Sequence, residues 1–175
     1  KALDETTFYP SKGKERLKSM IETRPDWCVS RQRVWGVPLP IFVNKKTKDI
    51  LVDDEVNETI ANIYEKEGSD CWFSDDPQRF LGKKYKSEDY EKLSDIVEVW
   101  FDSGSTHSFV LEKREDLKWP ASMYLEGSDQ HRGWFHSSLL ESCGTGGRAP
   151  FESILSHGFV VDGKGLKMSK SLGNV

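Results

Sequence analysis

Two segments of the chain carry apolar residues at the spacing of an amphipathic helix. Their apolar positions recur at i, i+3 and i+4, so they share one helix face. They are Leu17, Met20 and Ile21 in the first segment, and Val56, Ile60, Ile63 and Tyr64 in the second. The pattern predicts helices over residues 11–23 and 56–68. Pro25 and Gly68 end them, because proline cannot continue a helix and glycine favours a helix terminus.

Short apolar runs, each followed by polar or glycine-containing turns, predict β-strands. These runs are residues 41–43, 50–52, 96–101, 122–126 and 154–161. The polar residues 44–49 between the first two runs indicate a hairpin. A helix over residues 129–142, with Ser128 or Asp129 near its N-cap and Gly144 at its end, separates the last two. Strand, helix and strand in this order predict a βαβ unit of a parallel sheet, in which ligands bind beyond the carboxyl ends of the strands.

The middle of the chain differs in character from its two ends. Residues 44–94 are rich in charge and contain no recognisable chemical motif, which indicates an inserted module. The chain begins with Lys1 instead of methionine, and it stops at Val175 just after a glycine-rich loop, where a helix is expected to follow. We therefore expect the sequence to be a segment of a longer polypeptide.

Composition narrows the classes of function. The 25 basic residues against 29 acidic ones give a net charge of −4. Non-specific DNA binding needs a broad basic surface, so any nucleotide contact must come from a local cluster. No apolar run approaches the roughly 20 residues that cross a bilayer, and residues 1–5 do not form a secretory signal. We expect a cytoplasmic protein without membrane contacts.

The three cysteines give no sign of a disulfide framework or of a zinc site. Cys28, Cys71 and Cys143 are far apart, odd in number and form no C-x-x-C pair. Zinc ribbons and disulfide-rich domains need paired cysteines at short or regular spacings. We expect three reduced thiols and no metal site within this segment.

The segment with the clearest chemistry is the loop 162–174, which follows the last predicted strand. Its three glycines allow the backbone to approach a ligand closely. Lys164, Lys167 and Lys170 place three ammonium groups on this loop, as neutralising a polyphosphate requires. A solvated basic loop is the alternative, but the string Lys-Met-Ser-Lys-Ser at residues 167–171 argues against it.

Several other catalytic motifs are absent. The sequence contains no G-x-S-x-G segment, which excludes a hydrolase elbow. His131 and His136 are five residues apart, whereas an H-E-x-x-H zinc site needs two histidines on one helix face. Residues 144–147 lack the register of a dinucleotide fingerprint and follow a helix. Residues 82–84 lack the flanking residues of a Walker loop.

The string at residues 167–171 resembles the lysine loop of the class I aminoacyl-tRNA synthetases. Residues 24–36 resemble a segment that the isoleucine, valine and leucine enzymes share. Residues 99–107 and 124–135 are similar to the isoleucine-specific members in particular. The resemblance covers nearly the whole chain and is weakest over residues 44–94.

The resemblance implies an α/β fold: the C-terminal half of a Rossmann-like, parallel-sheet nucleotide-binding domain with a small inserted α+β module. Residues 1–43 would return from an editing insertion and begin the catalytic segment. Residues 44–94 would form the inserted connective module, and residues 95–175 the second half of the catalytic domain with its lysine loop. The family's other active-site half and its anticodon-binding helices are expected outside this sequence.

The resemblance also implies roles for individual residues. Trp100 and Trp134 are expected to wall the isoleucine pocket; for an isolated tryptophan, core packing is the alternative. Contacts to the aminoacyl-adenylate are expected from Glu126, Gly127, Asp129 and Gln130. In the loop, Lys170 is expected to be the principal catalytic and ATP-binding group, Lys167 the second, and Ser169 an assisting one. His131 belongs to the family's motif but equally suits a structural hydrogen-bonding role.

The function implied is that of an isoleucine-tRNA ligase. Isoleucine is activated with ATP and Mg²⁺ to isoleucyl-adenylate and then passed to tRNA(Ile), Mg²⁺ arriving with ATP. We expect the intact enzyme to be monomeric and the segment alone to be inactive. The alternatives are a non-catalytic half-domain that binds tRNA or protein, and a nucleotidyltransferase of the same fold that uses no amino acid.

Overall fold

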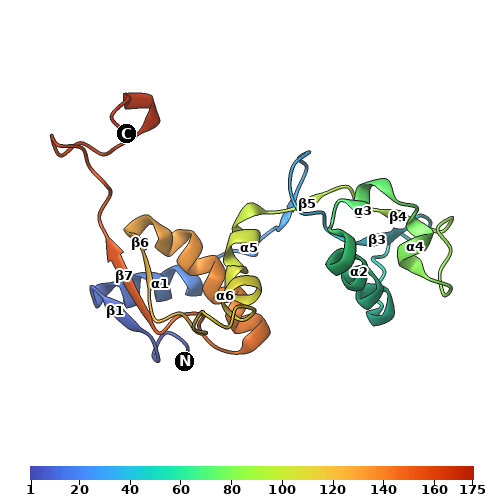
Figure 1. The fold of residues 1–175 in the computed structure, drawn as a ribbon, viewed down its shortest axis with the longest axis horizontal. Coiled ribbons are helices and arrows are strands. Elements are labelled where there is room, and N and C mark those ends of the chain that lie inside the picture. The colour runs from blue at the N-terminus through green and yellow to red at the C-terminus, as the bar shows by residue number, and fades with distance from the viewer. The chain divides into compact units, whose positions relative to one another are not determined.

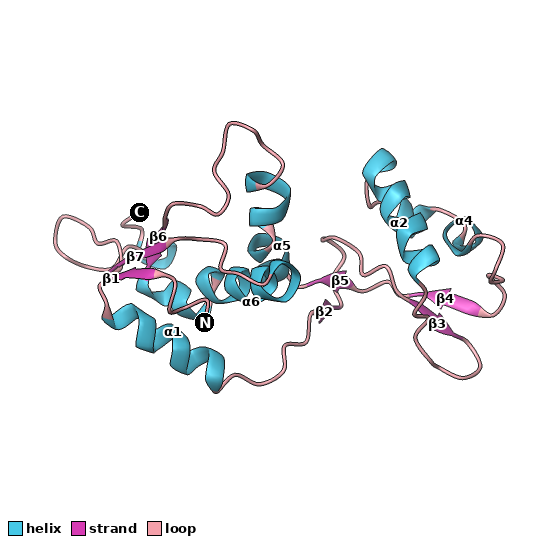
Figure 2. Cartoon of the chain, turned by 90° about the horizontal axis from the view of Figure 1, so that it is seen from below, coloured by secondary structure: helices cyan, strands magenta, loops and turns pink.

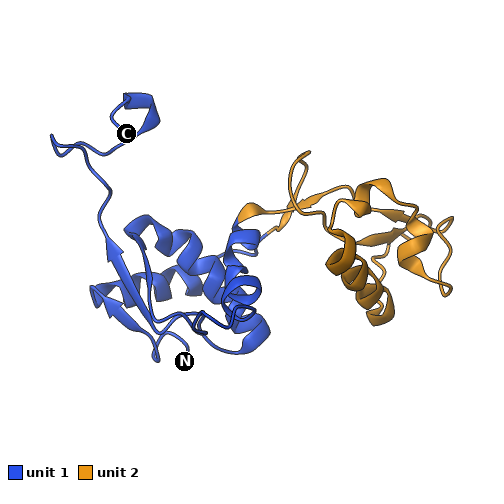
Figure 3. Ribbon diagram, in the orientation of Figure 1, with its two compact units in different colours: residues 1–27, 100–175 blue, residues 28–99 orange.

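The computed structural model describes all 175 residues and divides them into two compact units. The first unit comprises residues 1–27 and 100–175, and the second unit residues 28–99 (Figure 3). No helix in either unit has the length and apolar character needed to cross a membrane. The predicted inserted module, residues 44–94, lies within the second unit.

A parallel three-stranded sheet organises the first unit (Figure 1). Its strands, in spatial order, are β1 (Thr7–Tyr9), β7 (Ser153–His157) and β6 (Tyr124–Gly127). Strand β7 lies in the centre and pairs in parallel with both neighbours. The parallel pairing of β6 and β7 confirms the predicted βαβ unit. Strand β1 was not predicted, because three residues are too few to show an alternating pattern.

Two helices of the first unit share a core with this sheet (Figure 2). They are α1 (Lys12–Glu22), which matches its prediction, and α6 (Trp134–Gly146). The buried residues of this core are Phe8, Leu17, Tyr124, Phe135, Leu139, Ala149, Phe151 and Ile154. Both helices and all three strands contribute to it. Burial of these apolar side chains therefore fixes the helices against the sheet and sets where the strand ends lie.

The prediction of a strand over residues 96–101 was wrong. Only β5 (Ile96–Val97) is a strand, and the chain then forms α5 (Val99–Gly104) and a π-helical turn, η1 (His107–Leu111). The hydroxyls of Ser103, Ser105 and Thr106 donate hydrogen bonds to carbonyl oxygens three residues earlier. These local bonds give the backbone an alternative to the strand that the apolar residues of this segment favour.

The predicted helix over residues 129–142 begins later than expected. Residues Ser128–Arg132 form a 3₁₀ turn, η2, and the backbone of Gly133 leaves helical geometry at φ −122° and ψ −118° before α6 begins. The side-chain oxygen Oε1 of Gln130 accepts the backbone N–H of Trp134 at 2.9 Å. The predicted caps Ser128 and Asp129 are therefore not the caps of α6. The helix also runs past Gly144 and ends at Gly147, whose φ of 71° is left-handed.

The second unit is built from antiparallel pairs and three helices. Strand β2 (Ser30–Arg31) pairs with β5, and β3 (Phe42–Asn44) pairs with β4 (Tyr90–Lys92). The helices are α2 (Asp54–Glu67), α3 (Cys71–Ser74) and α4 (Pro77–Leu81). Helix α2 matches its prediction and ends at Gly68, whose φ is 83°.

The predicted hairpin at residues 44–49 is reduced to a single bridge between Val43 and Ile50, because β3 takes β4 as its strand partner instead. The core of the second unit lies between this strand pair and the helices. Its buried residues are Phe42, Val56, Ile60, Cys71, Trp72, Phe80 and Leu81. The predicted strand at 154–161 is also shorter than expected, since β7 ends at His157.

Candidate functional site

The carboxyl ends of β6 and β7 meet at one edge of the sheet in the first unit. In the register of this pair, Glu126 lies opposite Ser156 and Gly127 opposite His157. The side chain of Glu126 is exposed, whereas Gly127 is buried. Parallel pairing thus places a solvent-facing carboxylate at the end of the sheet where ligands of α/β proteins bind.

The next residues of the motif form the tight turn η2. A Cβ atom on Gly127 would lie 2.6 Å from Oδ1 of Asp129, so a larger residue at this position would displace the carboxylate of Asp129. Asp129 remains exposed, and the Oε1 atom of Gln130 accepts the N–H of Trp134. Glu126, Gly127, Asp129 and Gln130, four of the predicted site residues, thus lie at the end of β6 and in the turn that follows it. The side-chain amide oxygen of Gln130 caps the start of α6.

His131 lies in the interior, with 1% of its surface exposed. Its Nδ1 is 2.8 Å from the carbonyl oxygen of Ser128, and its ring meets that of Phe135 edge-on at 5.5 Å. A Cβ atom on Gly13 of α1 would lie only 3.2 Å from Nε2 of this ring. The histidine packs between the η2 turn and α1, which supports a structural hydrogen-bonding role for this residue.

The two predicted pocket tryptophans lie close to the start of α6. The ring of Trp134 stacks on that of Tyr124, with centroids 4.0 Å apart and planes 1° apart, and its Nε1 donates to the carbonyl of Ser103 at 2.9 Å. Trp100 is 42% exposed, and a Cβ atom on Gly133 would lie 3.2 Å from its ring. Trp134 is thus fixed by two contacts, while Trp100 is partly exposed to solvent.

Two residues that the sequence reasoning did not single out organise the lysine loop. Oδ1 of Asp162 accepts the backbone N–H groups of Lys164 and Leu166, and its Oδ2 accepts the side-chain amide of Asn174 at 2.7 Å. These hydrogen bonds, that of Asn174 foremost, lower the pKa of the Asp162 carboxyl. Asn174 also accepts the N–H of Ser169 at 3.0 Å. The Asp-Gly and Gly-Asn pairs that bracket the lysines are the turn signal that could have identified both.

Within this loop the three predicted groups have different surroundings. The ammonium of Lys167 lies over the ring of Phe159, 3.7 Å from its centroid. The hydroxyl of Ser169 accepts the N–H of Leu172 at 3.3 Å and caps a short 3₁₀ turn, η3 (Lys170–Leu172). Lys170 is exposed. No hydrogen bond or ion pair joins these groups to Glu126 or Asp129, so the chain by itself does not connect the loop to the strand ends.

A buried carboxyl on α6 was not identified from the sequence. Both carboxyl oxygens of Glu141 on α6 are inaccessible to solvent and have no hydrogen-bond partner. Burial raises the pKa of Glu141 to about 8, and the charge of Asp102 contributes in the same direction. A Cβ atom on Gly104 would lie 2.3 Å from Oε1 of Glu141, so α5 approaches α6 closely at this point. The only sequence signal is a glutamate directly after two leucines.

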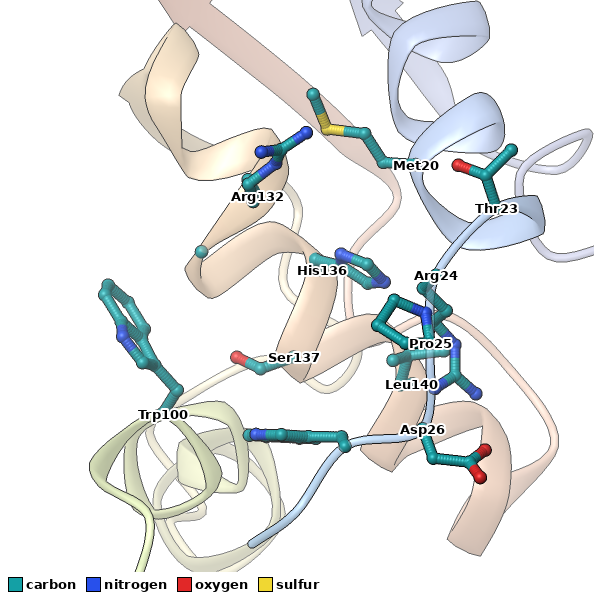
Figure 4. Close-up of a pocket in the computed structure, with 12 residues that line it drawn as sticks. Met20, Thr23, Arg24, Pro25, Asp26, Trp100, Arg132, His136, Ser137 and Leu140 are labelled. Carbon is teal, nitrogen blue, oxygen red and sulfur yellow. The ribbon is translucent and has the colours of Figure 1, made fainter.

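A cavity of about 440 Å³ lies beside Trp100 in the first unit (Figure 4). Its walls come from the end of α1, the chain that follows it, and one face of α6. The lining residues are Met20, Thr23, Arg24, Pro25, Asp26, Trp27, Trp100, Arg132, Gly133, His136, Ser137 and Leu140. Of the predicted site residues, only Trp100 reaches it. Nowhere in the chain do three or more His, Cys, Asp or Glu side chains gather in a group suited to a metal ion.

Comparison with known proteins places these features in a family. The model of the tRNA synthetases class I (I, L, M and V) matches residues 1–175. The chain is similar to the isoleucine-tRNA ligase of Pelagibacter ubique, with 87% identity over its whole length and 19% of the relative's. It is 59% identical to that of Zymomonas mobilis, again over 100% of this chain and 19% of the relative, and 62% identical to that of Brucella abortus, over 99% and 18%.

A solved structure supports the fold. The agnB2 LeuRS of Agrobacterium radiobacter K84, solved in a ternary complex with tRNA and LeuAMS, matches 91% of this chain and 24% of its own with a TM-score of 0.57 and 23% identity. The chain therefore has the α/β fold of that synthetase segment. It spans about a fifth of the length of the curated relatives it matches.

Proposed function

Because the chain belongs to the class I tRNA synthetases of the isoleucine, leucine, methionine and valine group, we propose that it is part of an isoleucine-tRNA ligase. The intact enzyme activates isoleucine with ATP to isoleucyl-adenylate and transfers the isoleucyl group to tRNA(Ile). The identity of 87% to a curated isoleucine-tRNA ligase over all 175 residues favours isoleucine over the other three amino acids.

The observation that carries this proposal is the parallel register of β6 and β7. It sets Glu126 and Gly127 beside Ser156 and His157, at the edge from which the chain continues to the lysine loop. The acidic turn after β6, which we propose contacts the amino acid and the ribose, thus lies at the same sheet edge as the end of β7. The chain continues from there to the loop that we propose binds the phosphates. The exposed Glu126 and Asp129 are suited to the α-ammonium of isoleucine or to ribose hydroxyls.

In the proposed first step, a carboxylate oxygen of isoleucine forms a bond to the α-phosphorus of ATP, and the bond from that phosphorus to pyrophosphate breaks. The attacking carboxylate is already ionised at pH 7, so the step needs no protein base. The protein therefore has to position the two substrates and to stabilise the charge on the phosphates with cationic groups. We assign the main cationic role to Lys170, which is exposed and free to meet a phosphate. Lys167 has the second role, and Ser169 assists through the turn that it caps.

The amino-acid pocket takes Trp100 and Trp134 as its walls. Apolar aromatic faces suit a branched aliphatic side chain, which they remove from water. Stacking on Tyr124 and the bond from Nε1 to Ser103 hold the Trp134 ring in place before substrate arrives. Gly127 and Gln130 complete the contacts to the adenylate: the glycine allows close backbone approach, and the amide offers a donor beside the α6 terminus.

Mg²⁺ enters this proposal bound to ATP, whose phosphate oxygens and water ligands are the oxygen donors that Mg²⁺ prefers. The exposed carboxylates of Glu126 and Asp129 are of the right donor type to contact its hydration shell. When bound, the ion neutralises charge on the phosphates. We place the enzyme in the cytoplasm, where its tRNA substrate is used, and expect it to act as a monomer.

Isoleucine-dependent ATP–pyrophosphate exchange in the full-length parent enzyme tests this function. We expect exchange with isoleucine and far less with valine or leucine, because the adenylate forms only when the side chain fills the pocket. The 175-residue chain alone should show no aminoacylation. Absence of exchange with every amino acid would favour a non-catalytic half-domain, and exchange that needs no amino acid would favour a nucleotidyltransferase.

A further inference from the structure

The buried carboxyl of Glu141 lies where α5 packs against α6 (Figures 1 and 2). A Cβ atom on Gly104, the last residue of α5, would lie 2.3 Å from Oε1 of Glu141, 2.8 Å from its Cδ and 3.0 Å from its Oε2. The whole carboxyl group therefore lies against the backbone of Gly104. Neither oxygen is accessible to solvent or has a hydrogen-bond partner. The packing of the two helices thus includes a polar group that no donor stabilises.

Both of these helices carry a wall of the proposed amino-acid pocket. Trp100 belongs to α5, and Trp134 is the first residue of α6. The carbonyl of Ser103, one residue before Gly104, accepts the N–H of the Trp134 indole at 2.9 Å. A displacement of Gly104 away from Glu141 would therefore move the hydrogen-bond acceptor of one tryptophan together with the helix that carries the other.

Glu141 also lies close to the residue that supports Trp134 from the sheet. The ring of Tyr124 stacks on that of Trp134 with centroids 4.0 Å apart, and its hydroxyl lies 3.1 Å from that of Ser138. Burial foremost raises the pKa of Tyr124, the hydrogen bond with Ser138 lowers it, and the charge of Glu141 raises it further. A negative charge on Glu141 would thus act on β6 as well as on α5.

The surroundings of Glu141 accept its neutral form and offer nothing to its charged form. A buried carboxylate needs hydrogen-bond donors or a cation, whereas an uncharged carboxyl costs much less to bury. Burial, and then the charge of Asp102, raise the pKa of Glu141 to about 8. Asp102 is the only charged side chain that contributes to this shift.

The other titratable groups around this part of α6 provide no cation to compensate. They lie on η1, on β6 and on α6 itself: His107, Tyr124, His136 and Cys143. Burial lowers the pKa of both histidines and raises that of the tyrosine and of the cysteine. All four are therefore uncharged where Glu141 titrates, so ionisation of Glu141 would leave a negative charge without a partner.

We propose that Glu141 is a positioning residue of the amino-acid pocket. Its uncharged carboxyl allows α5 to pack against α6, and this packing holds Trp100 and Trp134 in the arrangement that receives the isoleucine side chain. Ionisation of Glu141 separates the two helices and weakens isoleucine binding, although Glu141 does not touch the substrate. This inference rests on the proposed function and adds to it a control of isoleucine binding by one proton.

The test measures the KM for isoleucine in ATP–pyrophosphate exchange by the full-length enzyme from pH 7 to pH 9. The KM of the unmodified enzyme should rise about 10-fold relative to that of Glu141→Gln, because only molecules with a neutral Glu141 bind isoleucine and its pKa is about 8. The α-ammonium of isoleucine titrates alike in both assays, so the ratio of the two KM values isolates the enzyme's own group. The kcat should show no such difference, since the lysine loop is unaltered.

Two further variants complete the test. Glu15→Gln changes an exposed glutamate of α1, is the matched control and should follow the unmodified enzyme at every pH. Glu141→Leu repeats the comparison without any polar atom at the position, and its KM should likewise not rise with pH. If the KM of the unmodified enzyme follows that of these uncharged variants from pH 7 to pH 9 while exchange is normal, the positioning role is wrong. A pH-dependent difference in kcat and not in KM would also overturn it. Absence of isoleucine-dependent exchange in the unmodified enzyme would instead overturn the proposed function itself.

Discussion

The two units of the chain differ in how completely their buried polar groups find hydrogen-bond or ion-pair partners. In the second unit, the indole Nε1 of Trp72 donates to the carbonyl of Leu93 at 2.8 Å, and the ammonium of Lys92 donates to two backbone carbonyls. Arg79 pairs with both Glu67 and Asp75. Only the hydroxyl of Tyr64 is buried there without a partner. Nearly every group that this unit buries is satisfied within it.

The first unit leaves many more buried groups unsatisfied. The side-chain atoms without a hydrogen-bond partner belong to His107, His131, His136 and Glu141, although Nδ1 of His107 lies 3.6 Å from the carboxylate of Glu112. Each such group costs free energy, because it loses its hydrogen bonds to water without replacing them. Three of the four lie on α6 or the η2 turn just before it, next to the tryptophans and the strand ends. From this difference we infer that the second unit is organised for its own stability, whereas the residues around the site contribute less to the stability of the first unit.

The strongest test of this contrast replaces one tryptophan in each unit. Trp72 is completely buried, between Phe42 and Phe80, so Trp72→Ala should cost about 3–5 kcal/mol of unfolding free energy. Trp100 is 42% exposed, and Trp100→Ala should cost less than about 1 kcal/mol in the same chain. Urea unfolding followed by circular dichroism measures both. Similar losses in the two variants would contradict the contrast.

How far the sequence predicts the fold depends on the length of each element. Helices α1 and α2 have several turns, so their apolar periodicity is clear and their ends are marked by Pro25 and Gly68. Strand β1 has three residues and no readable period. In α5 and the turn after it, the hydroxyls of Ser103, Ser105 and Thr106 bond to backbone carbonyls in a segment whose apolar run favours a strand. These bonds depend on local geometry that no pattern of apolar residues records.

The next prediction compares two exposed lysines, one in each unit. In the full-length enzyme, Lys170→Ala should lower the rate of adenylate formation about 100-fold, because a preorganised cation stabilises charge that develops on the phosphates. Isoleucine binding should change little, since the pocket walls are untouched. Lys83→Ala removes an equally exposed lysine from the second unit and should leave both quantities unchanged. Single-turnover measurement of adenylate formation and equilibrium isoleucine binding separate the two effects. Parallel losses in rate and binding for Lys170→Ala would refute its assigned role.

The candidate site could be predicted where several of its residues lie within one short sequence motif. Glu126, Gly127, Asp129 and Gln130 are adjacent in sequence, so the turn that gathers them is local. The cavity could not be predicted, because Arg24 and His136 are more than 100 residues apart and meet only after α1 and α6 pack together. Glu141 was missed for a related reason. Its environment depends on Gly104 of another helix, and no local pattern identifies a glutamate that will be buried.

The smallest expected effect concerns two glutamates, Glu141 in the first unit and Glu67 in the second. Burial raises the pKa of Glu141 to about 8, whereas hydrogen bonding from Arg79 lowers the pKa of Glu67. Folded Glu141 thus keeps its proton while the unfolded chain ionises near the ordinary value of 4.5. Unfolding releases this proton between the two values, so the stability of the chain falls as pH rises from about 4.5 to 8.

Glu141→Gln removes that release while keeping the size and shape of the side chain. Its stability relative to the unmodified chain should therefore increase from pH 5 to pH 8, by about 1 kcal/mol because relaxation of the surroundings and water entry weaken the effect of burial. Glu67→Gln should show almost no change over this range, because the lowered pKa of Glu67 and its ordinary value both lie below pH 5; the loss of its paired carboxylate fades only as pH falls through the lowered pKa. Thermal unfolding of both variants across this pH range measures the difference. Since a buried amide also lacks partners at position 141, the change with pH is the decisive quantity and the stability at any single pH is not. If the stabilities of the two variants changed with pH in the same way, the unpartnered carboxyl of Glu141 would behave like the paired carboxyl of Glu67. The contrast between the units would then fail for these two residues.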